Sequence, residues 1–216
     1  MLTPAQIAWN RVALLKILDG AHKANNAPVD NFAVQKLSFV SELNGRSHNL
    51  QAAYYKFFRF TWGPYSSVLA NDVRLLESIG LIDPESRQIT ERGRFLLGYI
   101  QTEIDESEAA RLALDAISKT LEEWGGKRGW QIVNAVYELT VPVDERGGEK
   151  MKMKDIPLHT DIILPSIPGV QDVLPFSDQM LADIEAELAI PADHLDPESP
   201  ELEASVRCSL EAVFSR

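Results

Sequence analysis

The pattern of apolar and polar positions is most informative between residues 54 and 82. An aromatic run ends at Gly63-Pro64, a pair that breaks regular structure because proline fixes φ and has no N–H. Ser66 follows as an N-cap, and Gly80 stands where a left-handed residue would end a helix. Between them, apolar residues recur at helical spacing: Leu69, Val73, Leu76 and Ile79. The pattern therefore predicts a helix from Ser66 to Ile79, followed by a short strand at Leu81-Ile82.

Two amphipathic helices are predicted before the aromatic run. Thr3-Pro4 is an N-cap followed by proline at N1, and it begins a helix that we expect to stop near Gly20. Asp30 caps the second helix, which we expect Asn44-Gly45 to close. Their inward-facing residues are Ile7, Leu14, Leu15, Leu18, Ala33, Leu37, Val40 and Leu43. The aromatic run should be partly extended, with three phenylalanines in the core: Phe57, Phe58 and Phe60.

A small hairpin is predicted after the Leu81-Ile82 strand. Residues 83–86 form a turn with proline at its second position, and Gln88–Thr90 is the returning strand. Thr90 also caps a fourth helix, whose large side chains are Phe95, Leu96, Tyr99 and Ile100. The predicted fold class is therefore mainly α with a small β-hairpin wing. Residues 1–100 form a winged helix-turn-helix, and additional helices follow it.

Residues 101–142 are predicted to form a helical extension packed on this domain. Apolar residues recur there with gaps of four, three, four and three: Ala110, Leu114, Ile117, Leu121 and Trp124. This spacing suits a helix packed on its own domain, and it also suits a dimer helix. Gly125-Gly126 ends that helix, and another begins at Trp130 and is broken by Pro142.

The rest of the chain divides into a connector and an acidic segment. Residues 143–175 combine a mobile charged loop with a proline-rich stretch, in which Ile162–Leu164 is a short strand or a docking segment. Residues 176–216 form an acidic helical C-terminal segment. It is expected to hold two helices, at residues 177–189 and 199–214.

Charge is distributed unevenly along the 216 residues, whose net charge is −11. Residues 1–100 carry eleven Lys and Arg against eight Asp and Glu, whereas residues 101–216 carry ten against twenty-four. So negative a chain disfavours strong nonspecific DNA binding, which depends on neutralising phosphates. A solvated acidic surface explains the asymmetry simply. The sharper interpretation is that the acidic half binds a protein, for example one with a basic face.

Several classes of protein are not expected from this sequence. No apolar run approaches the roughly 18 residues of a membrane span, and no basic stretch leads into an apolar one at the start of the chain. The single cysteine, Cys208, cannot form an internal disulfide. These features predict a cytoplasmic protein with no membrane partner. Zinc-ligand spacing, phosphate-binding loops and nucleophile elbows do not occur, so we expect no enzyme, catalytic residue, cofactor or metal.

The segment around Gly63 resembles the Panacea antitoxin domain and its winged-helix relatives. In that group, a helix with a Leu-x-Lys-Leu-like core precedes an aromatic strand, a Gly-Pro-Tyr/Phe-Ser turn and a helix ending in Gly-Leu-Ile. The matching stretches here are Val34-Gln35-Lys36-Leu37, Phe58 to Phe60, Trp62-Gly63-Pro64-Tyr65-Ser66, and Leu76 to Ile82. The resemblance covers residues 5–100. It implies a winged-helix fold and a role in regulation or toxin neutralisation, with a toxin or a complex subunit as the protein partner.

Two candidate binding surfaces follow from the predicted elements. If the helix after Ser66 enters a DNA major groove, it presents one polar stripe, made of Ser67, Asn71, Arg74 and Ser78. Cations available for phosphate would be Lys56, Arg59, Arg87, Arg92 and Arg94. A solvated helix face is the alternative, with Glu77 paired to Arg74.

The second candidate surface is a protein-binding one formed by the rigid turn, with Trp62, Pro64 and Tyr65 as anchors. These residues can instead fill the gap between a helix and the wing. We therefore expect a non-enzymatic regulatory or antitoxin-like protein that acts through protein contacts. The alternative is a sequence-specific DNA-binding winged-helix repressor.

Overall fold

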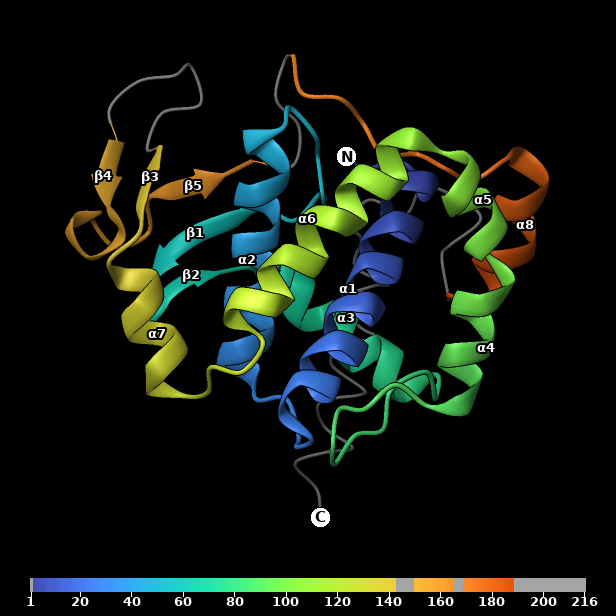
Figure 1. Ribbon diagram of the computed structural model, residues 1–216, viewed down its shortest axis with the longest axis horizontal. Helices are drawn as coiled ribbons and strands as arrows, with labels where there is room; N and C mark the ends of the chain where they lie inside the picture. The colour runs from blue at the N-terminus through green and yellow to red at the C-terminus, as the bar shows by residue number, and fades with distance from the viewer. Residues whose placement is uncertain (1, 143–149, 165–168, 189–216) are drawn as a thin grey trace, which may run out of the picture.

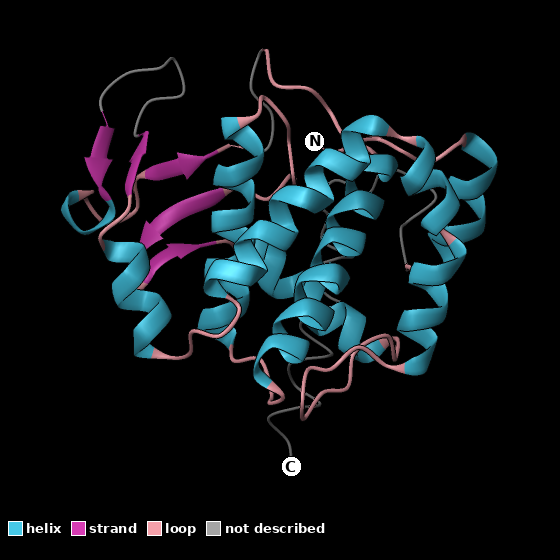
Figure 2. Ribbon diagram, in the orientation of Figure 1, coloured by secondary structure: helices cyan, strands magenta, loops and turns pink. Residues whose placement is uncertain are grey.

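The computed structural model describes residues 2–142, 150–164 and 169–188. The molecule is mainly helical, with a small three-stranded antiparallel sheet at one side (Figures 1 and 2), which confirms the predicted fold class. Its helices are α1 (Pro4–Asn25), α2 (Asn31–Ser47), α3 (Ser67–Ser78), α4 (Glu91–Tyr99), α5 (Gln101–Glu106), α6 (Glu108–Trp124), α7 (Trp130–Tyr137), η1 (Met153–Asp155) and α8 (Asp178–Glu187). Its strands are β1 (Phe57–Phe60), β2 (Gly63–Tyr65), β3 (Thr140–Pro142), β4 (Lys150–Lys152) and β5 (Asp161–Ile163).

The first helix, α1, lies at the centre of the molecule and is buried along most of its length. A capping box at Thr3 begins it, as the sequence predicts. It was wrongly expected to stop near Gly20, because it continues to Asn25 and ends with Asn26 in the left-handed conformation. Gly20 lies instead where α6 approaches α1 closely. A Cβ at this position would collide with the side chain of Leu121.

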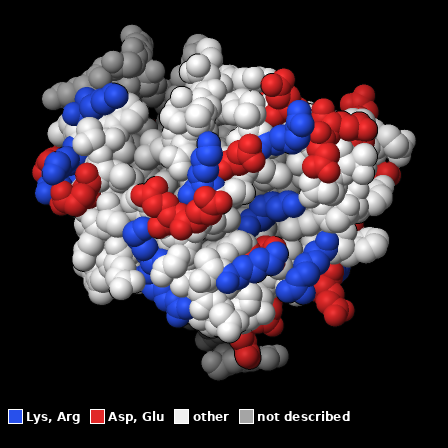
Figure 3. All heavy atoms as spheres, viewed as in Figure 1, with Lys and Arg blue, Asp and Glu red and all other residues white. Residues whose placement is uncertain are grey.

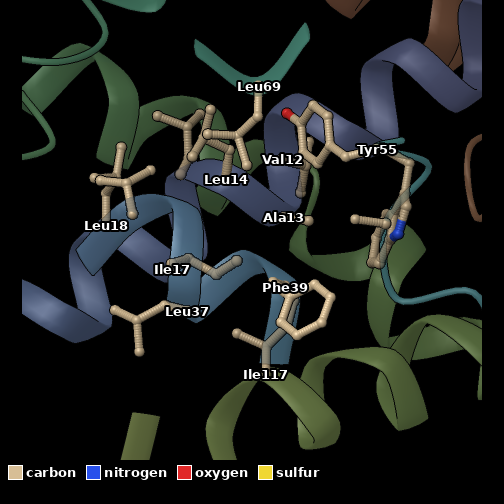
Figure 4. Close-up of a cluster of buried hydrophobic side chains, with 14 of the residues drawn as sticks. Val12, Ala13, Leu14, Ile17, Leu18, Leu37, Phe39, Tyr55, Leu69 and Ile117 are labelled. Carbon is tan, nitrogen blue, oxygen red and sulfur yellow. The ribbon is translucent and has the colours of Figure 1, made fainter. Parts of the chain in front are cut away.

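The core forms on both sides of α1. Figure 4 shows side chains of α1 between Leu69 of α3 on one side and Phe39 of α2 with Ile117 of α6 on the other. The predicted seam residues of α6 are buried or partly buried against the core, and α6 lies against α1 and α2 of the same chain. The helix that this spacing predicts therefore packs on its own chain in the structure. A well-packed core of this kind supplies the main stabilisation of a small domain.

Helix α2 begins where the sequence predicts and ends later. The Asp30 carboxylate accepts the N–H of Ala33 at 2.7 Å. The helix was expected to close at Asn44-Gly45, but it continues to Ser47. Gly45 is required for close packing, since a Cβ there would lie 2.8 Å from the Cβ of Ala52.

The three-stranded sheet has the order β2-β1-β5, and both neighbouring pairs are antiparallel. Gly63-Pro64 was expected to interrupt regular structure, but both residues belong to β2, and the turn lies at Thr61-Trp62. Strand β5 confirms the short strand predicted near Ile162. It joins β1 from about one hundred residues further along the chain. Such a pairing cannot be inferred from local pattern alone.

The three phenylalanines of β1 differ in burial because one face of the sheet packs on the core and the other faces outward. Phe57 is fully buried and lies 5.5 Å from Phe39, measured between ring centroids. The prediction that Phe58 and Phe60 are also core residues is wrong. Phe58 is half-buried, and Phe60 is 41% exposed.

A second hairpin pairs β3 with β4, and β4 lies in a region that was expected to be a mobile charged loop. Residues 143–149 of that region lie outside the described residues. Thr140 pairs with Lys152, and Pro142 pairs with Lys150. Met153 follows in η1 and is fully buried, which fixes this end of the hairpin to the core. The sequence missed the strand because Lys150–Lys152 is short and alternates charged residues with one methionine.

The predicted wing after α3 is present in reduced form. Ile82 and Ile89 make one antiparallel bridge. Two backbone hydrogen bonds flank it: Asp83 N–H to the Gln88 carbonyl at 2.8 Å, and Thr90 N–H to the Leu81 carbonyl at 3.0 Å. Of the large side chains predicted on α4, Leu96 and Ile100 are buried, while Phe95 and Tyr99 are exposed.

Helix α8 confirms the first of the two predicted acidic helices and packs on α1. Ile184 and Leu188 are fully buried, and Glu187 pairs with Arg92 of α4 at 2.6 Å. The buried Arg11 guanidinium donates to the Leu188 carbonyl. The second predicted helix, residues 199–214, and Cys208 lie outside the described residues.

Candidate protein-docking surface

Two sequence motifs that lie about thirty residues apart are joined by hydrogen bonds. The Gln35 side-chain amide of α2 accepts the Ser66 N–H at 2.8 Å and donates to the Ser66 carbonyl at 3.0 Å. The neighbouring Lys36 ammonium donates to the Pro64 carbonyl at 3.0 Å. Gln35 and Lys36 are both buried. The two side chains therefore hold the backbone of the Gly63–Ser66 segment against α2.

Burial changes the ionisation of Lys36. Desolvation, together with the nearby Arg59 guanidinium, lowers the pKa of its ammonium to about 8. The Lys36 side chain also lies close to Gly63, whose φ of +95° is a conformation that glycine adopts without strain. Tyr137 of α7 holds Thr61, two residues before Gly63, because its hydroxyl donates to the Thr61 carbonyl at 2.7 Å. The turn is thus fixed from two helices.

Three large aromatic side chains meet at this fixed turn and are exposed. Phe32 of α2 is 38% exposed, Trp62 of the turn is 45% exposed, and Trp130 of α7 is 57% exposed. Trp130 stacks on Phe32 with 6.4 Å between ring centroids, and it meets Trp62 edge-on at 4.9 Å. We call these three residues the tryptophan patch. Contiguous apolar surface of this kind is typical of binding sites.

A second aromatic cluster covers the outer face of the sheet. Phe58, Phe60, Tyr65 and His159 have ring centroids 5.6 to 6.4 Å apart. At these distances the rings contact one another and leave no room for a ligand between them. This cluster is therefore a packed exposed surface, and it is not an aromatic cage of the type that binds quaternary ammonium groups.

The charged residues nearest the tryptophan patch are mainly basic. Lys127 and Arg128 lie three and two residues before Trp130. Arg128 donates to the side chain and carbonyl of Asn25, and neither cation forms a salt bridge among the described residues. Asp30 uses one oxygen to cap α2 and the other to accept the Gly129 N–H at 3.1 Å. Lys127 lies over the Trp124 ring and donates to the Glu123 carbonyl, so the basic edge beside Trp130 is formed by Arg128.

Of the three residues predicted as anchors, only Trp62 belongs to the tryptophan patch. Trp62 is exposed as required, Tyr65 is half-buried against Phe58 and Phe60, and Pro64 is buried. The other two members of the tryptophan patch, Phe32 and Trp130, were missed. Trp130 was predicted only as the start of a helix, and in the structure the later apolar residues of that helix are buried while Trp130 is exposed.

The stripe predicted to read DNA bases is exposed on α3. It consists of Ser67, Asn71, Arg74 and Ser78. Arg74 donates to the Asn71 side chain at 3.2 Å. Glu77 was expected to pair with Arg74, but it pairs with Arg87 at 3.3 Å. Asp72 points away from the stripe and binds the buried Arg11 at 3.0 Å.

Most cations predicted to contact phosphate have partners within the chain. Lys56 pairs with Asp161 at 2.8 Å, and Arg87 and Arg92 make the ion pairs described above. Arg59 is buried, and its guanidinium binds the carbonyls of Met153 and Phe60 and lies over the Tyr137 ring. Its position thus does not suit a phosphate contact. Arg94 is exposed and has no ion pair among the described residues.

The visible surface carries charges of both signs. Figure 3 shows basic and acidic side chains interspersed over the face on which α6 lies, without one continuous basic band. Within residues 2–142, 150–164 and 169–188, no group of three or more His, Cys, Asp and Glu is placed to hold a metal ion. No helix in the described part of the chain has the length and apolar character needed to cross a membrane.

Comparison with known proteins adds no family assignment. No protein-family model, curated protein or solved structure matches this chain.

Proposed function

We propose that this protein is a non-enzymatic regulatory or antitoxin-like protein of the cytoplasm that binds a protein partner through the tryptophan patch. The observation that carries the proposal is the exposure of three aromatic rings where α2 and α7 meet a turn that is held rigidly from inside: Phe32, Trp62 and Trp130. Tryptophan is enriched among residues that contribute most to binding energy at protein interfaces. A rigid aromatic anchor also loses little conformational entropy on binding.

The resemblance to the Panacea antitoxin domain supports the same class of function. The stretches that carry it, around Gln35-Lys36 and Trp62–Ser66, are those that build and display this surface. Under this proposal the partner is a toxin or a subunit of a complex. The inner residues of the motif position the turn, and Trp62 contacts the partner.

The proposal is tested by comparing partner capture by matched variants. Trp130→Ser and Trp62→Ser each remove one exposed ring of the patch, whereas Phe95→Ser removes an exposed ring on α4. All three variants are checked for an unchanged urea unfolding curve. A partner that copurifies with the wild type and Phe95→Ser, and is lost from both tryptophan variants, supports the proposal. Equal recovery of that partner by every variant contradicts it.

The alternative function, a sequence-specific DNA-binding winged-helix repressor, is favoured by one observation: the predicted stripe on α3 is exposed. Gel shifts with DNA upstream of the protein's own gene, at several salt concentrations, test it. A repressor is expected to bind at low salt, and Arg74→Ala should relax specificity at one base. Absence of binding at low salt contradicts this alternative.

A further inference from the structure

We infer that the acidic tail of this chain, residues 189–216, docks in cis on the tryptophan patch and competes with the protein partner. This inference rests on the proposed function, because it names the regulation of the same surface. The tryptophan patch is an exposed aromatic surface with a basic edge. The tail, which follows α8, carries the opposite charge.

Charge and apolar content are complementary between the two parts. Residues 189–216 contain six Asp and Glu against two Arg, and they begin directly after Leu188. Three apolar residues in this tail recur at helical spacing: Leu202, Val206 and Leu210. The patch offers aromatic rings for such residues, and Arg128, two residues before Trp130, has no carboxylate partner among the described residues. An amphipathic helix lying in an apolar groove is a common mode of peptide recognition.

The tail is long enough to reach the patch. Its starting point is fixed, since the buried Arg11 of α1 binds the Leu188 carbonyl. From Arg11 to Asn25 the axis of α1 rises about 21 Å at 1.5 Å per residue. Asn25 accepts a hydrogen bond from Arg128, two residues before Trp130. Residues 189–201 span up to about 43 Å when extended, about twice that rise, which leaves length for the displacement across the helices that lie between α8 and α7 (Figure 1).

Docking in cis would give the chain a means of regulating its own binding. A tethered segment acts at a high effective concentration, so weak contacts suffice to occupy the patch. The association should weaken with salt, because the rim charges are exposed to solvent. A partner with higher affinity for the patch would displace the tail and release it.

The single cysteine allows a test on the full chain without mutation. A nitroxide spin label on Cys208 broadens NMR signals of nearby protons, and the four tryptophans give four indole N–H signals. We expect strong broadening for Trp62 and Trp130 and little for Trp9, which is buried and donates to the Ala52 carbonyl. Broadening should decrease at high salt. Equal broadening of Trp9 and Trp130, or of neither, overturns the inference.

Hydrogen exchange of the unlabelled full chain gives a second measurement, in case the label disturbs docking. Amides of residues 199–214 should exchange several-fold faster in Trp130→Ser and Arg128→Glu than in the wild type. Matched variants at exposed sites elsewhere, Phe95→Ser and Arg111→Glu, should leave these rates unchanged. Identical rates in all five proteins contradict docking on the patch.

Dilution and partner capture separate the remaining outcomes. If broadening disappears when labelled chain is diluted into unlabelled chain, the tail occupies a second copy, and docking in cis is wrong. If the tail does not dock but tryptophan variants still lose the partner, only this inference fails. If the tail docks but capture is independent of the patch, the proposed function fails.

Discussion

Replacing Gln35 by leucine should destabilise the protein, because this side chain joins α2 to the turn that displays Trp62. The amide accepts the Ser66 N–H at 2.8 Å and donates to the Ser66 carbonyl at 3.0 Å, and both groups are buried. Leucine preserves most of the side-chain volume but can form neither bond. The substitution therefore isolates the hydrogen bonds from the packing.

The expected magnitude follows from which groups lose their partner. The Ser66 carbonyl keeps a hydrogen bond from the Ala70 N–H at 3.2 Å. Losing the bond from Gln35 to this carbonyl therefore lowers the free energy of unfolding by only about 1 kcal/mol. The Ser66 N–H loses the Gln35 oxygen and becomes a buried donor without a partner, which costs roughly 1 to 3 kcal/mol. We expect Gln35→Leu to lower the free energy of unfolding by about 2 to 4 kcal/mol.

Urea unfolding followed by circular dichroism measures this change as a shift of the midpoint at constant slope. Gln131→Leu is the matched control, since Gln131 is exposed on α7 and its replacement should change stability by less than about 0.5 kcal/mol. An equally small change for Gln35→Leu would refute the view that this amide holds the turn. It would mean that packing alone positions the Gly63–Ser66 segment.

Three further predictions concern buried and surface charges. Asp72→Ala should cost about 3 to 5 kcal/mol by urea unfolding, because it leaves the buried Arg11 guanidinium without its carboxylate. Lys36 has a folded pKa of about 8 against a usual 10.5, so the folded state favours the neutral amine. The contribution of this side chain to the free energy of unfolding is therefore fully present above pH 10.5 and is lost as the pH falls toward 8. The stability of the wild type relative to Lys36→Met should thus rise with pH over this interval. Glu187→Gln breaks the exposed pair with Arg92 and should cost less than about 1 kcal/mol, and a larger loss would mean that this pair anchors α8.

Helix starts could be predicted from the sequence because their causes are local. Thr3, Asp30, Ser66 and Thr90 were all assigned as N-caps, and each accepts a backbone N–H from the first turn of its helix. Gly80 likewise has the expected left-handed conformation after α3, with a φ of +76°. Each signal requires only residues within one turn of the cap.

Helix ends and strand pairs were harder to predict because they depend on distant segments. Glycines at 20 and 45 suggested helix ends, but each lies where another part of the chain approaches closely. Strand β4 contains two lysines and becomes regular only through pairing with β3. Periodicity within one segment carries no information about such neighbours.

The candidate site shows the same limit for side chains. Trp62 could be proposed from its position beside a rigid turn, whereas Trp130 reaches the patch only because α7 packs next to α2 and β2. Arg59 was assigned to the surface by its charge. It is buried because carbonyls of Met153 and Phe60 satisfy its guanidinium. A buried polar residue is recognisable only when its partners are known.

The turn motif divides its residues between two tasks, and this division supports a binding role for the surface. Gly63, Pro64 and Ser66 are buried, and Gln35 and Lys36 bind the backbone of this segment. If stability alone shaped the turn, its tryptophan could pack inward with these residues. Instead the inner contacts leave the Trp62 ring 45% exposed against a second exposed tryptophan. A rigidly held anchor that stays open to solvent supports the proposed binding role, since the ordering cost would be met before binding.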